Sequence, residues 1–558
     1  MTQKLLLLLL ATAWWLPGFS QQPVRVKWWL EFSDKNNSPY CTCRPAEFLS
    51  ARALERRSRA GIAVVENDLP VNPHYLHALR SQSADIHNTS RWLNAATVVA
   101  DSVTARVLGQ LPFVKKIQYV GPDIPVRNPP NRPPKERVPL AERPSAQGET
   151  AGMGYASLQN SLLGVPLLHA VGYRGDGIWV AVMDGGFTNT DTLAFFDSVA
   201  VQGRLFEGWD FVERDRAVFE SAMHGTSVLS VMAANLPGFF IGAAPEATYF
   251  LLKTEDTGGE FPVEETNWIA GAEWADSIGV DILNASLGYT VFNDTTLGHW
   301  RAVLDGRTAI GSRGAAIAAT KGMIVCNSAG NSGDEPWTYV GVPADASGVI
   351  GVGAVEHSGE RASFSSQGPT ADGRIKPDLM APGATVVVAG ATGAELDVSQ
   401  GTSLASPMLV GSLASLWSAF PEKTAQEILD AVFVSADQVN DPDTLRGYGL
   451  PDMARSWLAL GRFLNKNAFN NARNGFFSYD RSAGELAVLL FENPEKSQTR
   501  MELTNCLGEP VAIGRAEWRT HTLTVITFEN MRDTKPGFYQ LVLRDGVGEW
   551  RLAVLLWP

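Results

Sequence analysis

Three polar residues of this chain, Asp184, His224 and Ser403, carry the groups of a hydroxyl nucleophile, a base and a carboxylate that orients the base. A serine hydroxyl becomes an effective nucleophile when an imidazole takes its proton, and a carboxylate fixes the tautomer of that imidazole. Each residue alone has a plainer interpretation, because Asp and Ser often cap helices and turns and a single His is usually structural. The surrounding sequence decides between the two interpretations.

That sequence places each of the three residues at the end of a regular element. Asp184 ends the apolar run WVAVMD and precedes two glycines, which permit a sharp turn. His224 opens HGTSVLSVMA, and Ser403 lies in GTSLASPMLVGSLASLW; both segments predict a helix that starts at a Gly-Thr-Ser turn. A helix N-terminus beside Ser403 would offer backbone N–H groups and a positive dipole end to an oxyanion. The combination predicts an Asp-His-Ser catalytic triad.

A second donor for an oxyanion is predicted at Asn331. The segment MIVCNSAGNSG is an apolar strand that ends in a glycine-flanked turn, which places the Asn331 carboxamide beyond the strand end. Alone, this residue would be taken for a turn-forming Asn. Next to a nucleophilic serine, a side-chain amide donor contributes on the order of 3 kcal/mol to transition-state stabilisation. We therefore expect Asn331 and the Ser403 N–H to hold the oxyanion together.

The elements that must position these residues follow from the hydrophobic pattern after Gly172. Short apolar runs alternate with helical segments, which implies a parallel sheet covered on both faces. We predict an α/β domain with a doubly wound parallel sheet and its site at the carboxyl ends of the strands. The runs expected to form its strands are GIWVAVMD, ATYFLLKTED, VDILNASLG, MIVCNSAGN, GVIGVGAVE and TVVVAG.

The pattern divides the chain into five parts. Residues 1–20 have a lysine before a short apolar run and small residues before Gln21, as in an export signal peptide. Residues 21–120 mix strands with a helix expected in PAEFLSARALERRSRAG, and residues 121–150 form a Pro-rich linker open to proteases. The catalytic domain is expected over residues 151–460. Residues 461–558 predict a small β-sandwich.

Charge and cysteine content narrow the functional classes. The formal net charge is -13, yet residues 21–150 carry 18 Lys and Arg against 12 Asp and Glu, so the rest of the chain is strongly acidic. An acidic body argues against nucleic acid as a partner, and opposite charges favour docking of the two parts. Cys41 and Cys43 are two residues apart, which predicts poor geometry for a mutual disulfide, and Cys326 is expected to be a buried thiol. No segment outside the first twenty residues is long and apolar enough to span a membrane.

The motifs together resemble the subtilisin family of serine proteases. The matching stretches lie within residues 155–460 and are VAVMDGG, HGTSVLSVMA, ILNASLG, SAGN, FSSQGPTADGRIKPDLMAPG and GTSLASPMLVG. The resemblance implies a secreted serine endopeptidase in which Ser403 attacks the scissile carbonyl. It also implies that Ser286, Leu287 and Gly288 pair with the peptide main chain, which agrees with the general use of strand addition by extended substrates. Gly185 departs from the Thr or Ser usual in the family and removes a side-chain hydrogen bond near Asp184.

The flanking segments also have family counterparts. Residues 21–120 resemble the propeptide of this family, which assists folding and occupies the cleft until it is cut away, and we expect self-cleavage within residues 121–150. The C-terminal segments ELTNCLGEPV, GFYQLVLRDG and RLAVLLWP resemble the sorting domain of type IX secretion cargo, which would make secretion machinery a partner. The stretch AFNNARNGFF matches the usual entrance of that domain only weakly. An ordinary accessory domain and a β-sandwich for substrate or surface binding are the respective alternatives.

Other chemical classes fit the sequence less well. An α/β-hydrolase esterase requires G-x-S-x-G and the chain order Ser, Asp, His, and a metalloprotease requires H-E-x-x-H; neither pattern occurs. The alternative from another class is a catalytically silent surface-binding protein that keeps the protease fold. The expected chemistry needs no cofactor, and its partners are protein or peptide substrates and the chain's own propeptide. Structural calcium is common among relatives, but the loops show no D-x-D-x-D-G pattern, so a metal stays open.

Overall fold

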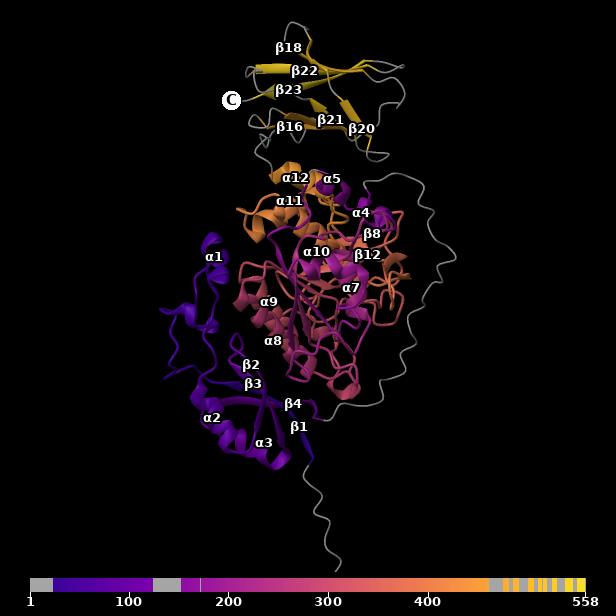
Figure 1. Ribbon diagram of the computed structural model, residues 1–558. Helices are drawn as coiled ribbons and strands as arrows, with labels where there is room; N and C mark the ends of the chain where they lie inside the picture. Colours follow the sequence, from indigo (N-terminus) through magenta and orange to yellow (C-terminus); the bar gives the residue numbers. More distant parts are fainter. Residues whose placement is uncertain are drawn as a thin grey trace, which may run out of the picture.

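The computed structural model describes residues 24–123, 152–170 and 172–460, and strands between residues 475 and 556. The expected signal peptide, most of the Pro-rich linker and the first residues of AFNNARNGFF lie outside these ranges. Three parts are visible in Figure 1: an N-terminal α+β domain, a central α/β domain and a set of C-terminal strands. None of the helices in the described ranges has the length and apolar character needed to cross a membrane.

The central domain is built on a seven-stranded sheet with the order β13-β12-β11-β10-β5-β9-β6. Every pairing in it is parallel, and the strands other than the edge strand β6 are almost wholly buried, as expected of strands covered on both faces. The predicted doubly wound α/β fold is therefore confirmed. The strands are β5 (Trp179–Asp184), β6 (Leu205–Asp210), β9 (Thr248–Lys253), β10 (Ile282–Ala285), β11 (Ile324–Ser328), β12 (Ile350–Val355) and β13 (Leu379–Pro382).

Helices cover the two faces of this sheet and create two hydrophobic cores. Alternate residues of β5 separate between the cores: Val180 and Val182 lie with α7 (His224–Ala233) and α10 (Thr402–Ser418). Ala181 and Met183 lie with α8 (Val263–Ile278) and α9 (Ile310–Ala319) on the other face. The remaining elements are α4 (Ser157–Ser161), α5 (Val165–Ala170), η4 (Ala194–Phe196), α6 (Asp197–Val201), β7 (Asn235–Leu236), β8 (Phe240–Ile241), η5 (Thr295–Leu297), η6 (Arg301–Val303), α11 (Ala425–Ser435) and α12 (Met453–Leu460).

One predicted strand of the parallel sheet is wrong. The run TVVVAG forms β14 (Val386–Ala389), which pairs antiparallel with β15 (Leu396–Ser399) in a separate two-stranded sheet. No helix separates β13 from β14, and a parallel neighbour would require a crossover connection of a dozen or more residues. The apolar pattern alone does not distinguish the two pairings.

The N-terminal domain is a four-stranded antiparallel sheet with the order β2-β3-β1-β4, and it buries both of its faces. Helices α2 and α3 cover the outer face around Leu30, Leu79 and Val98. The inner face lies on α8, where Trp29 and Ala95 belong to the same core as residues of the catalytic domain (Figure 1). The elements are β1 (Arg25–Phe32), α2 (Pro73–Ser81), β2 (Asp85–Ser90), β3 (Ala95–Asp101), α3 (Ser102–Leu108) and β4 (Val114–Pro122).

A long connection, residues 33–72, links β1 to α2 and is called the arm below. It contains η1 (Pro45–Glu47), α1 (Ala51–Arg59) and η2 (Glu66–Asp68), so the single helix predicted here is divided. The division falls at Ser50, whose side chain accepts a hydrogen bond from the Ala53 N–H and caps α1. The expectation that Cys41 and Cys43 do not bond each other is wrong, because a turn brings their Cα atoms to 5.2 Å and a disulfide joins them. Cys326 is a buried free thiol, as predicted.

The C-terminal strands form two four-stranded antiparallel sheets, β16-β17-β21-β20 and β19-β18-β22-β23. Figure 1 shows them beyond α12, at the opposite end of the catalytic domain from α2 and α3. Further β-strands after the catalytic domain were predicted and are confirmed. They are β16 (Gly475–Asp480), β17 (Glu485–Leu490), β18 (Arg500–Asn505), β19 (Pro510–Ile513), β20 (Arg515–Trp518), β21 (Thr524–Phe528), β22 (Gly537–Arg544) and β23 (Glu549–Leu556).

Candidate active site

Asp184 and His224 form a hydrogen-bonded pair at the carboxyl end of β5. The His224 Nδ1 atom lies 2.9 Å from Asp184 Oδ1 and 2.8 Å from Oδ2. The Asp184 side chain is 1% exposed and also accepts the Gly185 N–H at 2.8 Å, whereas 46% of the His224 side chain is exposed. A buried carboxylate on Nδ1 places the imidazole proton there and makes Nε2 the basic nitrogen.

Glycines allow the two elements that carry this pair to approach each other. A Cβ atom on Gly225 would lie 2.3 Å from the Gly186 carbonyl oxygen and 2.9 Å from Asp184 Cβ. Gly186 itself has φ +135°, a conformation that other residues rarely adopt. At Gly185 a Cβ would meet no atom nearer than 3.4 Å, so there is room for a Cβ atom at this position. The turn after β5 therefore depends on Gly186 and Gly225 rather than on Gly185.

Ser403 and Asn331 face a common space at the start of α10. Gly401, with φ +148°, precedes the helix, and a Cβ atom on it would lie 3.5 Å from Ser403 Oγ and 3.6 Å from both carboxamide atoms of Asn331. The Asn331 Oδ1 atom accepts hydrogen bonds from the Thr402 N–H at 2.8 Å and the Thr402 hydroxyl at 3.0 Å. Because its oxygen is held by a backbone donor, Asn331 presents its NH₂ group as the donor at the site.

The predicted substrate-pairing residues lie directly after β10. Ser286 and Leu287 are buried and Gly288 is exposed, so the chain reaches the surface at the glycine. The Leu287 carbonyl accepts a hydrogen bond from Asn327 at 2.8 Å, and the Ser286 hydroxyl donates to the Ser403 carbonyl at 2.8 Å. The structure therefore brings Ser286 against the start of α10 and Leu287 against β11.

Asn284 supports this arrangement and was not identified from the sequence. It is fully buried on β10, donates to the Ser286 hydroxyl at 3.1 Å and accepts from the Ser406 hydroxyl at 2.8 Å. The chain of bonds ties β10 to the first turns of α10, which carry Ser403. An Asn within an otherwise apolar strand was the available indication, because a buried amide requires partners.

An acidic cluster adjoins the turn after Asp184. Oxygen atoms of Glu255, Glu260 and Glu264 lie within 4.8 Å of one another, and a Cβ on Gly185 would be 3.5 Å from Glu255 Cβ. Burial, together with the charges of the other two glutamates, raises the pKa of Glu264 well above its ordinary value. Carboxylate oxygens suit a hard cation such as calcium, for which three protein oxygens are fewer than the six to eight it takes. The sequence left a metal open, and these three carboxylates do not assign one.

Comparisons with known proteins relate this chain to a family. Residues 175–450 match the subtilase family of S8 peptidases, and residues 27–136 match the S8 propeptide domain of Bacteroidota. Subtilisin of Bacillus pumilus is 32% identical over 274 residues, which are 48% of this chain and 87% of that protein. The chain belongs to the subtilase family.

Other subtilases match a smaller part of their own length. Subtilisin E of Bacillus subtilis (strain 168) is also 32% identical over 274 residues, but these residues are 63% of that protein, so the chain spans less than two thirds of it. Fervidolysin from Fervidobacterium pennivorans, a keratinolytic enzyme related to subtilisin, has a similar structure, with a TM-score of 0.53 at 18% identity. That likeness covers 96% of this chain and 77% of fervidolysin and shows the shared fold. The predicted family and its propeptide domain are confirmed.

Proposed function

We propose that this subtilase is a serine endopeptidase that hydrolyses peptide bonds through an acyl-enzyme intermediate. The observation that carries the proposal is the hydrogen-bonded pair of Asp184 and His224, held at the mouth of the same sheet as Ser403 on α10. The family match over residues 175–450 supports a hydrolase of this kind. The residues of this chain suffice for the chemistry, with no cofactor in any step.

In the proposed reaction, Ser403 Oγ attacks the scissile carbonyl carbon while His224 Nε2 takes the hydroxyl proton. The Asn331 NH₂ group and the Ser403 N–H donate to the carbonyl oxygen as it becomes negative. His224 then gives its proton to the leaving amine, and the carbon–nitrogen bond breaks. A water molecule attacks the ester with His224 again as base, which releases the acid and restores Ser403. Asp184 stays ionised and stabilises the imidazolium in both halves.

The substrate backbone is proposed to pair with residues 286–288. Gly288 is exposed, and a Cβ on it would meet no atom nearer than 3.9 Å, so the space beside it is open to a second backbone. Main-chain hydrogen bonds recognise any extended peptide and leave side-chain preference to other parts of the cleft. We therefore propose protein and peptide segments in extended conformation as the substrate class.

The N-terminal domain is proposed to act as a propeptide that is removed by cleavage in the linker. Its last strand, β4, ends beside the segment between Glu260 and Glu264, where a Cβ on Gly121 would lie 3.1 Å from Phe261 Cβ and 3.4 Å from Val263 Cγ1. The chain thus leaves the propeptide domain on the Glu255 side of the candidate site. We also propose export by the N-terminal signal peptide, with zymogen processing after export.

A sorting role in type IX secretion is proposed for residues 461–558 from their sequence resemblance. Deletion of residues 465–558 from the full chain should strand the protein in the periplasm of a host with this pathway. Equal amounts of the intact and the shortened protein outside the cell would refute the role.

The endopeptidase proposal is tested with purified full-length protein and a mixture of denatured proteins. Wild type should generate new peptide termini. Ser403→Ala and Asp184→Asn should each lower the rate at which these termini form by about four orders of magnitude or more. The precursor of Ser403→Ala should keep its full size, while wild type loses the N-terminal domain. An unchanged substrate mixture with processed wild type would favour a surface-binding protein that keeps the fold.

A further inference from the structure

The propeptide domain contacts α8 along its whole length. The amino-terminal half of the helix is reached by β2 and β3, where the Thr97 hydroxyl donates to that of Thr266 at 3.0 Å and Asn88 donates to Asn267 at 2.7 Å. The amino end of α8 lies beside β4, and its carboxyl end lies beside the arm. With sixteen residues, α8 separates these ends by about 24 Å. The arm therefore binds a place remote from the candidate active site.

The arm completes the carboxyl end of α8. The Ser50 N–H donates to the Ser277 carbonyl and the Ser50 hydroxyl to the Ile278 carbonyl, each at 2.8 Å. Arg52 Nε donates to the Gly279 carbonyl at 3.1 Å. The last carbonyls of a helix have no partner within it and carry its negative dipole end. The amino end of α1 and its arginines supply both the hydrogen bonds and the positive charge.

Gly279 shapes this surface for the arm. Its φ is +95°, which ends α8 in a left-handed conformation, and a Cβ on it would lie 2.7 Å from the Ala53 N–H nitrogen. A glycine ending a helix is common for conformational reasons alone. Here the same residue also makes room for the backbone of α1.

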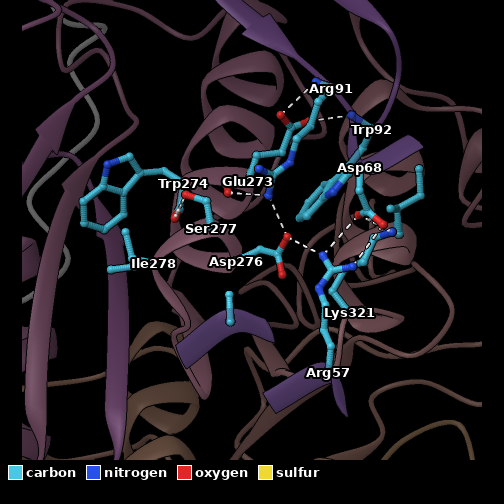
Figure 2. A network of polar contacts seen from close by, with 12 residues as sticks. Arg57, Asp68, Arg91, Trp92, Glu273, Trp274, Asp276, Ser277, Ile278 and Lys321 are labelled. Carbon is cyan, nitrogen blue, oxygen red and sulfur yellow. Dashed lines mark hydrogen bonds and ion pairs between the residues drawn. The ribbon is translucent and has the colours of Figure 1, made fainter. Parts of the chain in front are cut away.

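Asp276 is the centre of a buried ionic network between the two domains (Figure 2). Three guanidinium groups of the propeptide domain contact its carboxylate, at 2.5 Å from Arg56, 2.7 Å from Arg57 and 2.6 Å from Arg91. The Asp276 side chain is 0% exposed, and the arginines are 10% exposed or less. One carboxylate of the catalytic domain thus contacts three guanidinium groups of the propeptide domain at once.

The network also contains an ion pair of reversed polarity, in which the propeptide domain supplies the acidic residue and the catalytic domain the basic one. Arg57 also forms two hydrogen bonds with Asp68 of the arm, at 3.0 and 3.1 Å. Asp68 in turn lies 2.8 Å from the Nζ atom of Lys321 in the catalytic domain, as Figure 2 shows. The sign of the charge therefore alternates along the network, from Asp276 through Arg57 and Asp68 to Lys321, and each domain contributes one acidic and one basic member to this path. Such alternation fits one partner and disfavours others.

Buried charges make this contact sensitive to the loss of any member. Taking an ion out of water is costly, and the cost is recovered only while its partners are in place. Removal of the Asp276 charge would leave three buried guanidinium groups facing one another without their shared carboxylate. The network therefore stabilises the docked propeptide domain only while all of its charged residues are present.

We propose that the arm is a second anchor of the propeptide domain, and that the ionic network at Asp276 sets how fast the domain leaves after the linker is cut. Two contacts on one rigid domain slow its dissociation. When one contact opens, the other keeps the domain close, so the open contact re-forms. Cutting the linker therefore leaves the domain bound until the arm detaches. The role in activation rests on the proposed processing, whereas the anchor itself does not.

The test uses the full chain with Ser403→Ala, so that no self-cleavage occurs, and with a recognition sequence for an unrelated site-specific protease placed within residues 124–150. After that protease has cut the linker, loss of the N-terminal fragment from the catalytic part is followed over time by size-exclusion chromatography. Asp276→Asn should speed this loss by about 100-fold, and so should Arg57→Met. The double variant should dissociate much more slowly than the product of the two single accelerations predicts, because both changes remove the same contact.

Glu55→Gln is the matched control on the same helix. Glu55 is 73% exposed and pairs only at the surface with Arg59, so its loss should leave the dissociation rate unchanged. If Asp276→Asn does not fold, the same measurement is made with Arg57→Met and Arg91→Met, which add no further change to the catalytic domain. Equal dissociation rates for the parent and the Asp276 and Arg57 variants would overturn the proposal. Because an added protease makes the cut, this result does not depend on whether the chain is itself a peptidase.

Discussion

A fall in pH is expected to loosen the propeptide domain through His87. This residue lies on β2 with 8% of its surface exposed, beside Asn267 and Phe211 of the catalytic domain. Burial, with the nearby charges of Lys27 and Arg214, lowers the His87 pKa from 6.5 to about 3. The imidazole is therefore neutral in the docked state, and a proton is bound more readily once the domain has left.

The sign and size of the effect follow from this difference. A base whose pKa is lowered by docking favours docking above its free pKa, near 6.5, and opposes it as the pH falls toward 3. Between pH 7 and pH 5 the contribution of His87 amounts to roughly 25-fold in the dissociation constant, or about 2 kcal/mol. Buried Glu273 acts in the opposite direction, because burial raises its pKa and protonation then favours the docked state.

The comparison with His87→Gln isolates the histidine. The cut-linker form of the Ser403→Ala chain is equilibrated at pH 7 and pH 5, and the dissociation constant of the N-terminal fragment is measured at both. The ratio of the two constants should be roughly 25-fold larger for the parent than for His87→Gln, since Glu273 contributes equally to both. Equal ratios for the two proteins would refute the assignment of a buried, neutral His87 at the interface.

Three further predictions concern the candidate site and its supports. Asn331→Ala should lower kcat by about 10²–10³-fold with little change in KM, and a loss confined to KM in steady-state peptide hydrolysis would argue against an oxyanion role. Gly225→Ala should lower the Tm by several degrees, since its Cβ would lie 2.3 Å from a carbonyl oxygen, whereas Gly288→Ala, with no atom nearer than 3.9 Å, should leave the Tm unchanged. Ser406→Ala should cost about 1–3 kcal/mol in urea unfolding, because it removes a donor from buried Asn284; an unchanged midpoint would contradict this.

Much of the fold could be predicted because each element has a local pattern. The strand that ends at Asp184 is a short apolar run followed by glycines, and the helices that begin near His224 and Ser403 start at small residues before long apolar stretches. Parallel strands buried on both faces then place these ends on one side of the sheet. These patterns were sufficient to predict that Asp184 ends a strand and that His224 and Ser403 lie at the start of helices.

The errors arise where the hydrophobic pattern and the residue spacing do not determine the conformation. The run TVVVAG satisfies the pattern of a buried parallel strand, yet its partner is β15. The Cys41–Cys43 disulfide depends on a local turn rather than on residue spacing.

The interface charges were beyond sequence reasoning for the same reason. Asp276 lies in a helical segment where an acidic residue usually faces water, and its arginine partners come from a different domain. The net charges of the two parts predicted attraction but not its location. The burial of Asn284, Glu273 and Asp276 became interpretable only with their partners in view.

The proposed nucleophile is tested most directly by covalent labelling. Processed wild-type protein is treated with an aryl fluorophosphonate, and the modified peptide is identified by mass spectrometry. One adduct is expected, on Ser403, with labelling slowed by several orders of magnitude in His224→Ala and absent from the same peptide in Ser403→Ala. An adduct on another residue, or no adduct after the propeptide domain has left, would contradict the assignment of Ser403 as the nucleophile.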